Sequence, residues 1–442
     1  MMSATVSYQK TIPVRHEVDV FVAGGGPSGV AAALVAAREG RSVFLAESHT
    51  CLGGMGTAGL VPGFCQFGDG VNFLAAGIGS EIDRLLTAEK GEVITGTARS
   101  IPAEPMKRVY DRLMVEAGVN FTFHTNVVDV ISRDGALDMA ICSAKSGFFA
   151  VKAKIFIDGT GEGDLAAFAG AKFEKGDVDG STMPGTLCSV WADVDYDKYL
   201  EAKPDRRALL FQAFEDGVFT VNDPHHPGMW RLGRHIAGGN IGHAFGVDAS
   251  DERSLTHFLI EGRQRMPEFE RFYRDYMPGF EKLVLVQTGS LLGIRENRRI
   301  IGDYILNVDD FIARAVFPDE IGRYCYPVDI HPSQPSAEKY AAFEKEFREQ
   351  LRYSTGESYG IPYRILTPVG FSNLLVGGRC VSCDRKIQGS IRVIPGCYIT
   401  GQAAGMAAAI AIENNTDTRG FPVSELQRRL LKMGAFLPNY KG

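Results

Sequence analysis

The 442-residue sequence lacks long apolar runs and any concentration of basic charge. Runs such as Met406–Ile412 are far shorter than the roughly 20 residues that span a bilayer, so no membrane span is expected. The first twenty residues show no apolar core followed by a small-residue cleavage site, which predicts no secretion signal and a cytoplasmic location. With 47 basic and 53 acidic residues, the net charge of −6 disfavours nucleic acid and anionic membranes as partners.

Cysteine is also scarce. Eight cysteines are too few for a disulfide scaffold in a chain of this length, and only Cys380 and Cys383 stand at a suggestive spacing. We find no quartet of cysteine, histidine and acid with the spacing of a metal site, so no metal is expected. The neighbours His225 and His226 precede Pro227 and are expected on an exposed loop.

Glycine, in contrast, is abundant, with 51 residues or about 12 % of the chain against an average near 7 %. In the segment Val18–Glu47, a short strand-like run leads into Gly24, Gly26 and Gly29 and then into an alanine-rich helix. A second apolar run follows and stops at the acid Glu47. This order predicts a β-α-β unit with the G-x-G-x-x-G fingerprint of dinucleotide binding.

Each residue of the fingerprint has a physical role. Gly24 permits the tight turn, Gly26 lets the backbone approach a pyrophosphate, and Gly29 lets helix and strand pack closely. The helix N-terminus offers free N–H groups to the phosphates. Glu47 stands where its carboxylate can accept both hydroxyls of an adenosine ribose, which implies an unphosphorylated 2′-hydroxyl. NAD and FAD both fit such a unit.

The segment after Glu47 favours FAD. It reads SHTCLGGMGTAGLV, with the pair Gly53-Gly54 in a stretch where a nicotinamide dehydrogenase normally continues with a helix. On these motifs the sequence resembles the FAD-dependent oxidoreductases of the glutathione-reductase-like flavoprotein superfamily, and more narrowly a bacterial FAD-dependent oxidoreductase family. The resemblance continues through Ala153–Gly170 and through the segment from Asn373 to Ala411, where Gly401 is expected to open the last helix.

The resemblance implies an α/β fold, with a Rossmann-like FAD-binding domain of three-layer ββα/α architecture and an inserted α+β substrate domain. The FAD-binding domain is expected to be discontinuous, residues 1–172 and 366–442, with residues 173–365 inserted. It also implies which residues contact non-covalently bound FAD: Gly24, Gly26, Pro27, Ser28, Gly29, Glu47, Ser48, Gly53, Gly54, Met55, Thr57, Val127, Val128, Thr160, Gly161, Asp164, Gly378, Arg379, Gly401, Gln402 and Ala403. Arg379 departs from the many relatives that carry an acid there to hold the ribityl chain.

Oxidation by a flavin needs a proton acceptor and a substrate anchor near the flavin. His331 lies between a strand-like run and a proline and is our first candidate for the base, with His243 second. The charge cluster in LLGIRENRRIIG has apolar flanks, so one of its arginines is a candidate carboxylate anchor, the alternative being a structural ion-pair network. The predicted catalytic set is His331, Arg295, Glu296, Arg298, Tyr326, Arg364 and His243, with Arg392 as a further candidate.

The leading functional hypothesis is an FAD-dependent dehydrogenase or oxidase that acts on a hydroxy acid or a sugar derivative. The alternatives are a disulfide or heterodisulfide reductase using Cys380 and Cys383 and, third, an FAD-stabilised scaffold or RNA-modifying protein. Covalent attachment of the flavin at His49 or Cys51 is disfavoured by the spacing of these residues. No second fingerprint for a nicotinamide cofactor is present, so oxygen, a quinone or a carrier protein is the expected electron acceptor.

Overall fold

The computed structural model describes residues 5–90, 94–95, 98–225 and 228–442. In this part of the chain, seven strands form one sheet in the order β5-β2-β1-β8-β7-β6, with β17 also paired to β8. The parallel part consists of β5 (Asn120–Thr122), β2 (Val43–Ala46), β1 (Val14–Ala23), β8 (Gly147–Asp158) and β17 (Leu374–Val376). This sheet confirms the predicted α/β class.

The predicted β-α-β unit is confirmed as β1, helix α1 (Pro27–Arg38) and β2. Gly24 has φ +86°, a conformation that side chains rarely adopt, and a Cβ on Gly29 would lie 1.9 Å from the Gly24 carbonyl oxygen. Pro27 stands in the first turn of α1, where its missing N–H costs nothing. The turn and the close packing therefore need glycine for the reasons that the fingerprint implies.

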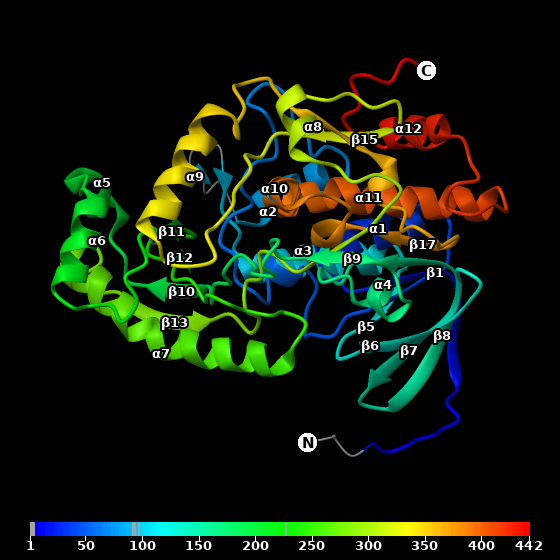
Figure 1. Cartoon of the computed structure of the whole chain (residues 1–442), viewed down its shortest axis with the longest axis horizontal. Coiled ribbons are helices and arrows are strands. Elements are labelled where there is room, and N and C mark those ends of the chain that lie inside the picture. Colours follow the sequence, from blue (N-terminus) through cyan, green and yellow to red (C-terminus); the bar gives the residue numbers. More distant parts are fainter. Residues whose placement is uncertain (1–4, 91–93, 96–97, 226–227) are drawn as a thin grey trace.

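The sheet becomes antiparallel at one edge. The long strand β8 pairs with β7 (Ala136–Ala144) through its first half and with β17 through its last three residues, and β7 pairs with β6 (Asn126–Arg133). Figure 1 shows this edge at the lower right, extending away from the helices. A turn at His124, which has φ +51°, separates β5 from β6.

The long apolar helix α11 (Ile394–Glu413) packs directly on α1. A Cβ on Gly401 would lie 2.2 Å from the carbonyl oxygen of Ser28, and a Cβ on Gly405 would lie 2.3 Å from that of Ala32. The expectation that Gly401 opens the last helix was wrong, because the helix begins seven residues earlier. The glycines there allow two helices to touch.

A second group of elements lies on the left in Figure 1. Strands β11 (Gly228–Arg231), β12 (Ala237–Asn240), β10 (Ser189–Ala192) and β13 (Val284–Thr288) form an antiparallel sheet in that order. Helices α5 (Tyr196–Ala202), α6 (Arg206–Glu215) and α7 (Glu252–Tyr276) accompany it. Their buried residues form a separate hydrophobic cluster between Leu187 and Leu292.

Most of the remaining elements share a hydrophobic cluster with the large sheet. Buried residues from Ile300 to Leu366 belong to the first hydrophobic cluster, together with the core of the large sheet. The boundaries predicted for the two domains stay a prediction. The remaining helices and strands of the described residues are α2 (Ile78–Lys90), β3 (Ile94–Thr95), β4 (Ala98–Arg99), α3 (Ala103–Glu116), α4 (Asp164–Phe168), β9 (Phe173–Lys175), β14 (Arg298–Ile300), α8 (Val308–Ala313), β15 (Glu320–Tyr324), α9 (Ala337–Glu349), β16 (Tyr359–Pro362), α10 (Arg385–Ile391), α12 (Val423–Lys432) and the 3-10 turns η1 (Gly54–Gly56), η2 (Tyr363–Ile365) and η3 (Gly378–Cys380).

Within the described residues, no single helix has the length and apolar composition needed to cross a bilayer. The pair α10 and α11 meets that test only when it is taken together across a 93° bend, and 18 residues of α11 are buried inside the protein.

Candidate active site

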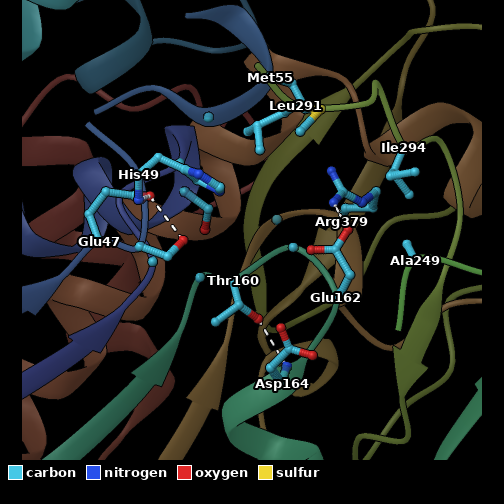
Figure 2. A pocket seen from close by; sticks show the side chains of 18 of the residues that line it. Glu47, His49, Met55, Thr160, Glu162, Asp164, Ala249, Leu291, Ile294 and Arg379 are labelled. Carbon is cyan, nitrogen blue, oxygen red and sulfur yellow. Dashed lines mark hydrogen bonds and ion pairs between the residues drawn. The ribbon is translucent and has the colours of Figure 1, made fainter. Parts of the chain in front are cut away.

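A deep pocket opens where the carboxyl ends of the parallel strands meet the second group of elements. It is lined by the turn after β1, by the end of β2, by the loop after β8 and by the turn after β17 (Figure 2). Leu255 and Leu259 of α7 and Ile294 close it from the other group. Fourteen of the predicted FAD contacts line it: Gly24, Gly26, Pro27, Ser28, Glu47, Ser48, Gly54, Met55, Val127, Thr160, Gly161, Asp164, Gly378 and Arg379.

The shape and chemistry of this pocket fit a dinucleotide. A Cβ on Gly26 would have nothing closer than the Gly159 carbonyl oxygen at 3.7 Å, so the backbone there borders open space. The buried hydroxyl oxygen of Ser28 has no hydrogen-bond partner in the described structure. The buried carboxylate of Glu47 accepts from the backbone N–H groups of Gly25 and His49 at 2.6 and 2.8 Å. These bonds fix Glu47 at the end of β2, where a ribose would lie.

The loop after β8 is held by Asp158. Its carboxylate accepts from the backbone N–H and the hydroxyl of Thr160 at 3.0 and 2.7 Å and from the backbone N–H of Ala166 at 2.9 Å. Burial is the largest influence on Asp158 and raises the pKa of its carboxyl to about 6, although these hydrogen bonds work in the opposite direction. Helix α4 begins at Asp164, directly after this loop.

Two arginines line or border the same pocket. Arg379 forms an ion pair with Glu162, and both side chains are largely buried. Arg298 donates to the Asp164 carboxylate at 2.6 Å and to the Glu162 carbonyl oxygen at 3.2 Å. Arg298 therefore holds Glu162 and Asp164, which line the pocket, from behind.

A second polar centre contains two of the predicted histidines. His243 and His331 are almost fully buried, and Nε2 of His243 lies 3.0 Å from Nδ1 of His331. The Asp223 carboxylate is 2.8 Å from Nδ1 of His243, and Asp329 is 3.3 Å from Nε2 of His331. Two carboxylates therefore face the outer nitrogens of a histidine pair.

The charges around this centre favour neutral imidazoles and ionised carboxylates. Burial, followed by the charge of Arg295, lowers the pKa of His331 well below its usual value, and burial likewise lowers the pKa of His243. Burial opposes ionisation of Asp329, but His331, Arg392 and Arg295 outweigh it and lower the pKa of that carboxyl.

Arg295 comes from the loop that also contributes Ile294 to the pocket. Its guanidinium donates to the Pro184 carbonyl oxygen at 2.9 Å, to the Thr186 hydroxyl at 2.7 Å and to the Asn240 side-chain oxygen at 3.2 Å. No carboxylate of the described residues lies within ion-pair distance of it. Burial and the nearby Arg392 lower its pKa.

Comparison with known proteins places this site in a family. The family model of FAD-dependent oxidoreductases matches residues 19–430, which is nearly the whole chain. The chain belongs to the FAD-dependent oxidoreductase family. It is thus an enzyme and a flavoprotein, with FAD as its cofactor.

Two characterised proteins resemble parts of this oxidoreductase. A digeranylgeranylglycerophospholipid reductase of Methanospirillum hungatei is 32 % identical over 145 residues, which cover 29 % of this chain and 34 % of that protein. A thiamine thiazole synthase of Methanococcus aeolicus is 29 % identical over 192 residues, 40 % of this chain and 66 % of that one. The matches therefore span about one third and just under two thirds of these relatives.

Among solved structures, a geranylgeranyl bacteriochlorophyll reductase-like protein of Thermoplasma acidophilum superposes with a TM-score of 0.48 at 15 % identity, over 95 % of this chain and 83 % of that one.

The oxidoreductase brings together only part of the predicted catalytic set. His331, His243 and Arg295 meet at the second polar centre, and the Tyr326 hydroxyl lies 3.4 Å from Asp329. Glu296 is buried elsewhere, where it accepts from Arg299, Arg385 and the Met183 backbone N–H. Arg364 pairs with Asp319 at 2.9 Å and its side chain is 44 % exposed. Most of the charged residues from Arg295 to Arg299 thus form the structural ion-pair network that the sequence offered as the alternative to a carboxylate anchor.

The expectation of an exposed loop at His225 was wrong, because its ring stacks on His243 with centroids 4.4 Å apart. His226 and Pro227 lie outside the described residues. Sequence reasoning also missed Asp223 and Asp329. A signal was present, since Asp-x-His occurs at both Asp223–His225 and Asp329–His331.

Seven predicted FAD contacts do not line the pocket: Gly29, Gly53, Thr57, Val128, Gly401, Gln402 and Ala403. Gly29 and Gly401 are needed for backbone packing. Gln402 binds the Ile78 backbone N–H and the Ala76 carbonyl oxygen at 3.0 and 3.1 Å, which ties α11 to α2.

Proposed function

We propose that this oxidoreductase oxidises a small polar substrate, a hydroxy acid or a sugar derivative, by hydride transfer to N5 of FAD. Bound FAD supplies the hydride acceptor, and the chain supplies the pocket, a substrate anchor and a proton acceptor. We also propose that it belongs to the glutathione-reductase-like flavoproteins, as a dehydrogenase or oxidase with non-covalent FAD.

The observation that carries this proposal is Arg295, whose half-buried guanidinium has no carboxylate within ion-pair distance among the described residues. A guanidinium shielded from water is ordinarily paired with an anion, since removing an unpaired charge from water is costly. Arg295 has only neutral oxygens as hydrogen-bond partners among the described residues. A substrate carboxylate or another anionic oxygen completes its charge balance, and a guanidinium binds such a group through two parallel hydrogen bonds.

The proton acceptor belongs to the neighbouring histidine pair. Neutral imidazole is the form that accepts a proton, and burial keeps His331 and His243 neutral. His331 is the first candidate and His243 the second. Asp329, which is 3.3 Å from His331, would stabilise the imidazolium that forms.

The substrate end of the pocket lies where the predicted inserted segment, residues 173–365, faces the cofactor. Leu255, Leu259 and Ile294 support this placement because they line the pocket opposite the nucleotide-binding turns. Arg295 directly follows Ile294, which connects the cofactor pocket to the polar centre.

The proposal is tested by anaerobic mixing of the FAD-loaded enzyme with hydroxy acids, sugars, amines and thiols while the absorbance of oxidised flavin is followed. Bleaching by a hydroxy acid or sugar acid, and not by its ester, is the expected result. Bleaching by thiols alone would replace the proposal with the disulfide reductase. Acid precipitation of the enzyme should release intact FAD into the supernatant, and flavin retained in the pellet would contradict non-covalent binding.

A further inference from the structure

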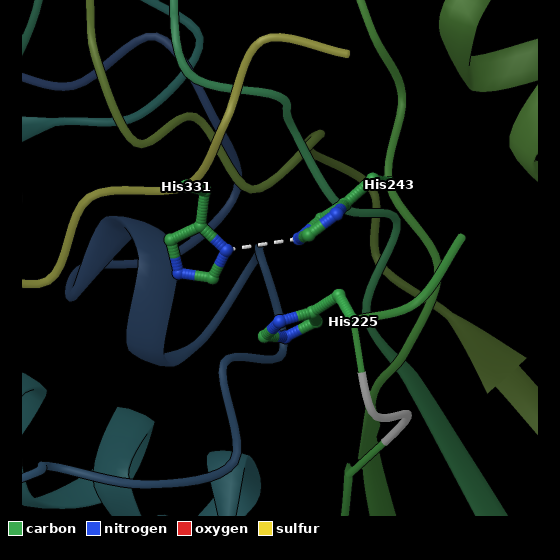
Figure 3. Close-up of side chains that lie close together, drawn as sticks. All are labelled: His225, His243 and His331. Carbon is green, nitrogen blue, oxygen red and sulfur yellow. Dashed lines mark hydrogen bonds between the residues drawn. The ribbon is translucent and has the colours of Figure 1, made fainter. Parts of the chain in front are cut away.

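Three imidazoles converge at the second polar centre. Ring nitrogens of His225, His243 and His331 all lie within 4.8 Å of one another (Figure 3). They come from three separate segments, before β11, after β12 and after β15. His243 and His331 are 2 % and 6 % exposed, and His225 is half-buried. A proton acceptor needs only one histidine, so the meeting of three histidines from distant parts of the chain indicates a further role.

The two carboxylates determine which nitrogens face inward. Asp223 lies 2.8 Å from Nδ1 of His243 and Asp329 lies 3.3 Å from Nε2 of His331, and because an ionised carboxylate only accepts, we assign a proton to each of these two nitrogens. The inner nitrogens of both neutral rings, 3.0 Å apart, then carry lone pairs that point at each other. Two lone pairs at this distance repel, so a positive species is needed there, either a shared proton or a metal ion.

His225 decides between these two species. A shared proton is bound by two nitrogens and needs no third. The His225 ring lies 4.4 Å from the His243 ring and 4.8 Å from the His331 ring, centroid to centroid. A tetrahedral zinc ion with bonds of about 2.0 Å holds its nitrogen ligands about 3.3 Å apart. The nitrogens of the His243–His331 pair are already near that separation at 3.0 Å, and a ring nitrogen of His225 lies within 4.8 Å of both.

We propose that His225, His243 and His331 bind a divalent transition-metal ion of the zinc class, with the fourth coordination position open. Imidazole is a preferred ligand of such ions. A ligating histidine ordinarily donates its other N–H to a carboxylate, as His243 does to Asp223 and His331 to Asp329. The prediction that the chain holds no metal is thereby revised.

The charges nearby specify the fourth ligand. Asp223 and Asp329 balance Arg295 and Arg392, so a dication here requires an anionic oxygen at the open position. The anionic fourth ligand rests on the proposed function, in which a deprotonated hydroxy acid would supply the oxygen. The metal site itself does not rest on the proposed function. A metal on Nδ1 of His331 leaves that ring without a free lone pair, because its Nε2 donates to Asp329, so His331 is then a ligand and not the base.

The test uses the FAD-loaded full-length enzyme, stripped with a chelator, passed through a desalting column and titrated with Zn²⁺ against a chromogenic chelator. One Zn²⁺ per chain is expected. His225→Ala, His243→Ala and His331→Ala should each weaken Zn²⁺ binding at least tenfold, and Asp223→Asn should weaken it by ~10–100-fold because it only orients a ligand. His257→Ala, an exposed histidine on α7, should bind Zn²⁺ normally. Substitution with Co²⁺ should produce the visible absorption of a tetrahedral site.

Flavin content and the thermal unfolding midpoint show whether each variant has folded. Should His331→Ala fail to fold, His225→Ala and Asp223→Asn carry the test, because their side chains are less central. A wild-type enzyme that binds no Zn²⁺ would overturn the proposal and leave the histidine pair sharing a proton. Stoichiometric Zn²⁺ that survives all three histidine variants would overturn it as well. Neither outcome depends on flavin reduction, so the proposed function is judged separately.

Discussion

The Arg392 guanidinium donates to the main-chain carbonyl oxygen of Arg295 at 3.0 Å. The same guanidinium donates to the carbonyl oxygen of Asp329 at 2.9 Å and lies 3.5 Å from its carboxylate. Arg392 lies between α10 and α11. It therefore connects the start of α11 to the two loops that contain Arg295 and Asp329. The geometry of that centre therefore depends on a residue that does not itself contribute an imidazole.

Arg392→Met should disturb both segments at once. The variant keeps most of the apolar stem but leaves Asp329 and two carbonyl oxygens without their donor, which we expect to lower the free energy of unfolding by roughly 2–3 kcal/mol. Urea unfolding of the two proteins measures this. Arg263→Met, at an exposed position on α7, serves as the control and should change stability by less than about 0.5 kcal/mol. Equal stability of the wild type and Arg392→Met would contradict the connecting role.

Gly26 and Gly29 should respond differently to substitution although both belong to the fingerprint. A Cβ on Gly26 enters open pocket space, and its φ of −67° suits any residue, so Gly26→Val should fold but lose FAD. A Cβ on Gly29 would lie 1.9 Å from the Gly24 carbonyl oxygen, so Gly29→Val should destabilise the fold itself. Flavin absorbance per chain and circular dichroism separate the two outcomes. Full FAD content in Gly26→Val would refute the placement of the pyrophosphate.

The contrast between these glycines shows how far the sequence could lead. The fingerprint predicts a local unit whose parts are adjacent in the chain, and β1, α1 and β2 follow it. The polar centre is different, because Asp223, His243 and Asp329 meet only through the packing of three loops. The helix α7 is also hard to predict from the sequence, because Pro267 lies within it and proline ordinarily disrupts a helix interior. Asp251 caps it by accepting from the backbone N–H groups of Arg253 and Ser254 at 3.3 and 3.2 Å.

Cys380 and Cys383 should not form an obligate redox pair. Both are free and buried, and burial raises the pKa of each thiol, which disfavours the thiolate that attacks a disulfide. Cys383→Ser should therefore keep the substrate-driven rate of anaerobic flavin reduction within about twofold of the wild type. Labelling with iodoacetamide under native conditions should be slow at both positions. A variant that has lost flavin reduction while retaining FAD would instead support the reductase alternative.

Cys142 should make the stability of the protein fall at alkaline pH. This thiol is fully buried in β7, and burial raises its pKa from 9.0 to about 12. Because the folded pKa lies above the unfolded one, its contribution is fully present below pH 9 and is lost as the pH rises towards 12. From pH 8 to pH 10 the unfolding free energy of the wild type should decrease by about 1.4 kcal/mol more than that of Cys142→Ala. Urea unfolding under reducing conditions at both pH values measures the difference, and parallel pH dependences would contradict the assignment.

Arg295 provides the sharpest test of the substrate end. If its guanidinium binds an anionic substrate oxygen, Arg295→Met should raise the substrate dissociation constant by about 10–100-fold, because the variant loses one charge-assisted hydrogen-bonding group. The limiting rate of flavin reduction at saturating substrate should fall less, because an anchor contributes mainly to binding. Arg295→Lys keeps the charge but not the planar fork, so it should recover only part of the affinity.

The measurement is a concentration series of anaerobic flavin reduction with the best substrate of the panel. Arg364→Met is the matched control, since Arg364 was a candidate for the same role but pairs with Asp319 on a partly exposed surface. Unchanged affinity in Arg295→Met together with weakened affinity in Arg364→Met would assign the anchor to Arg364 instead. Equal affinity in both variants would show that Arg295 does not bind an anionic oxygen of the substrate.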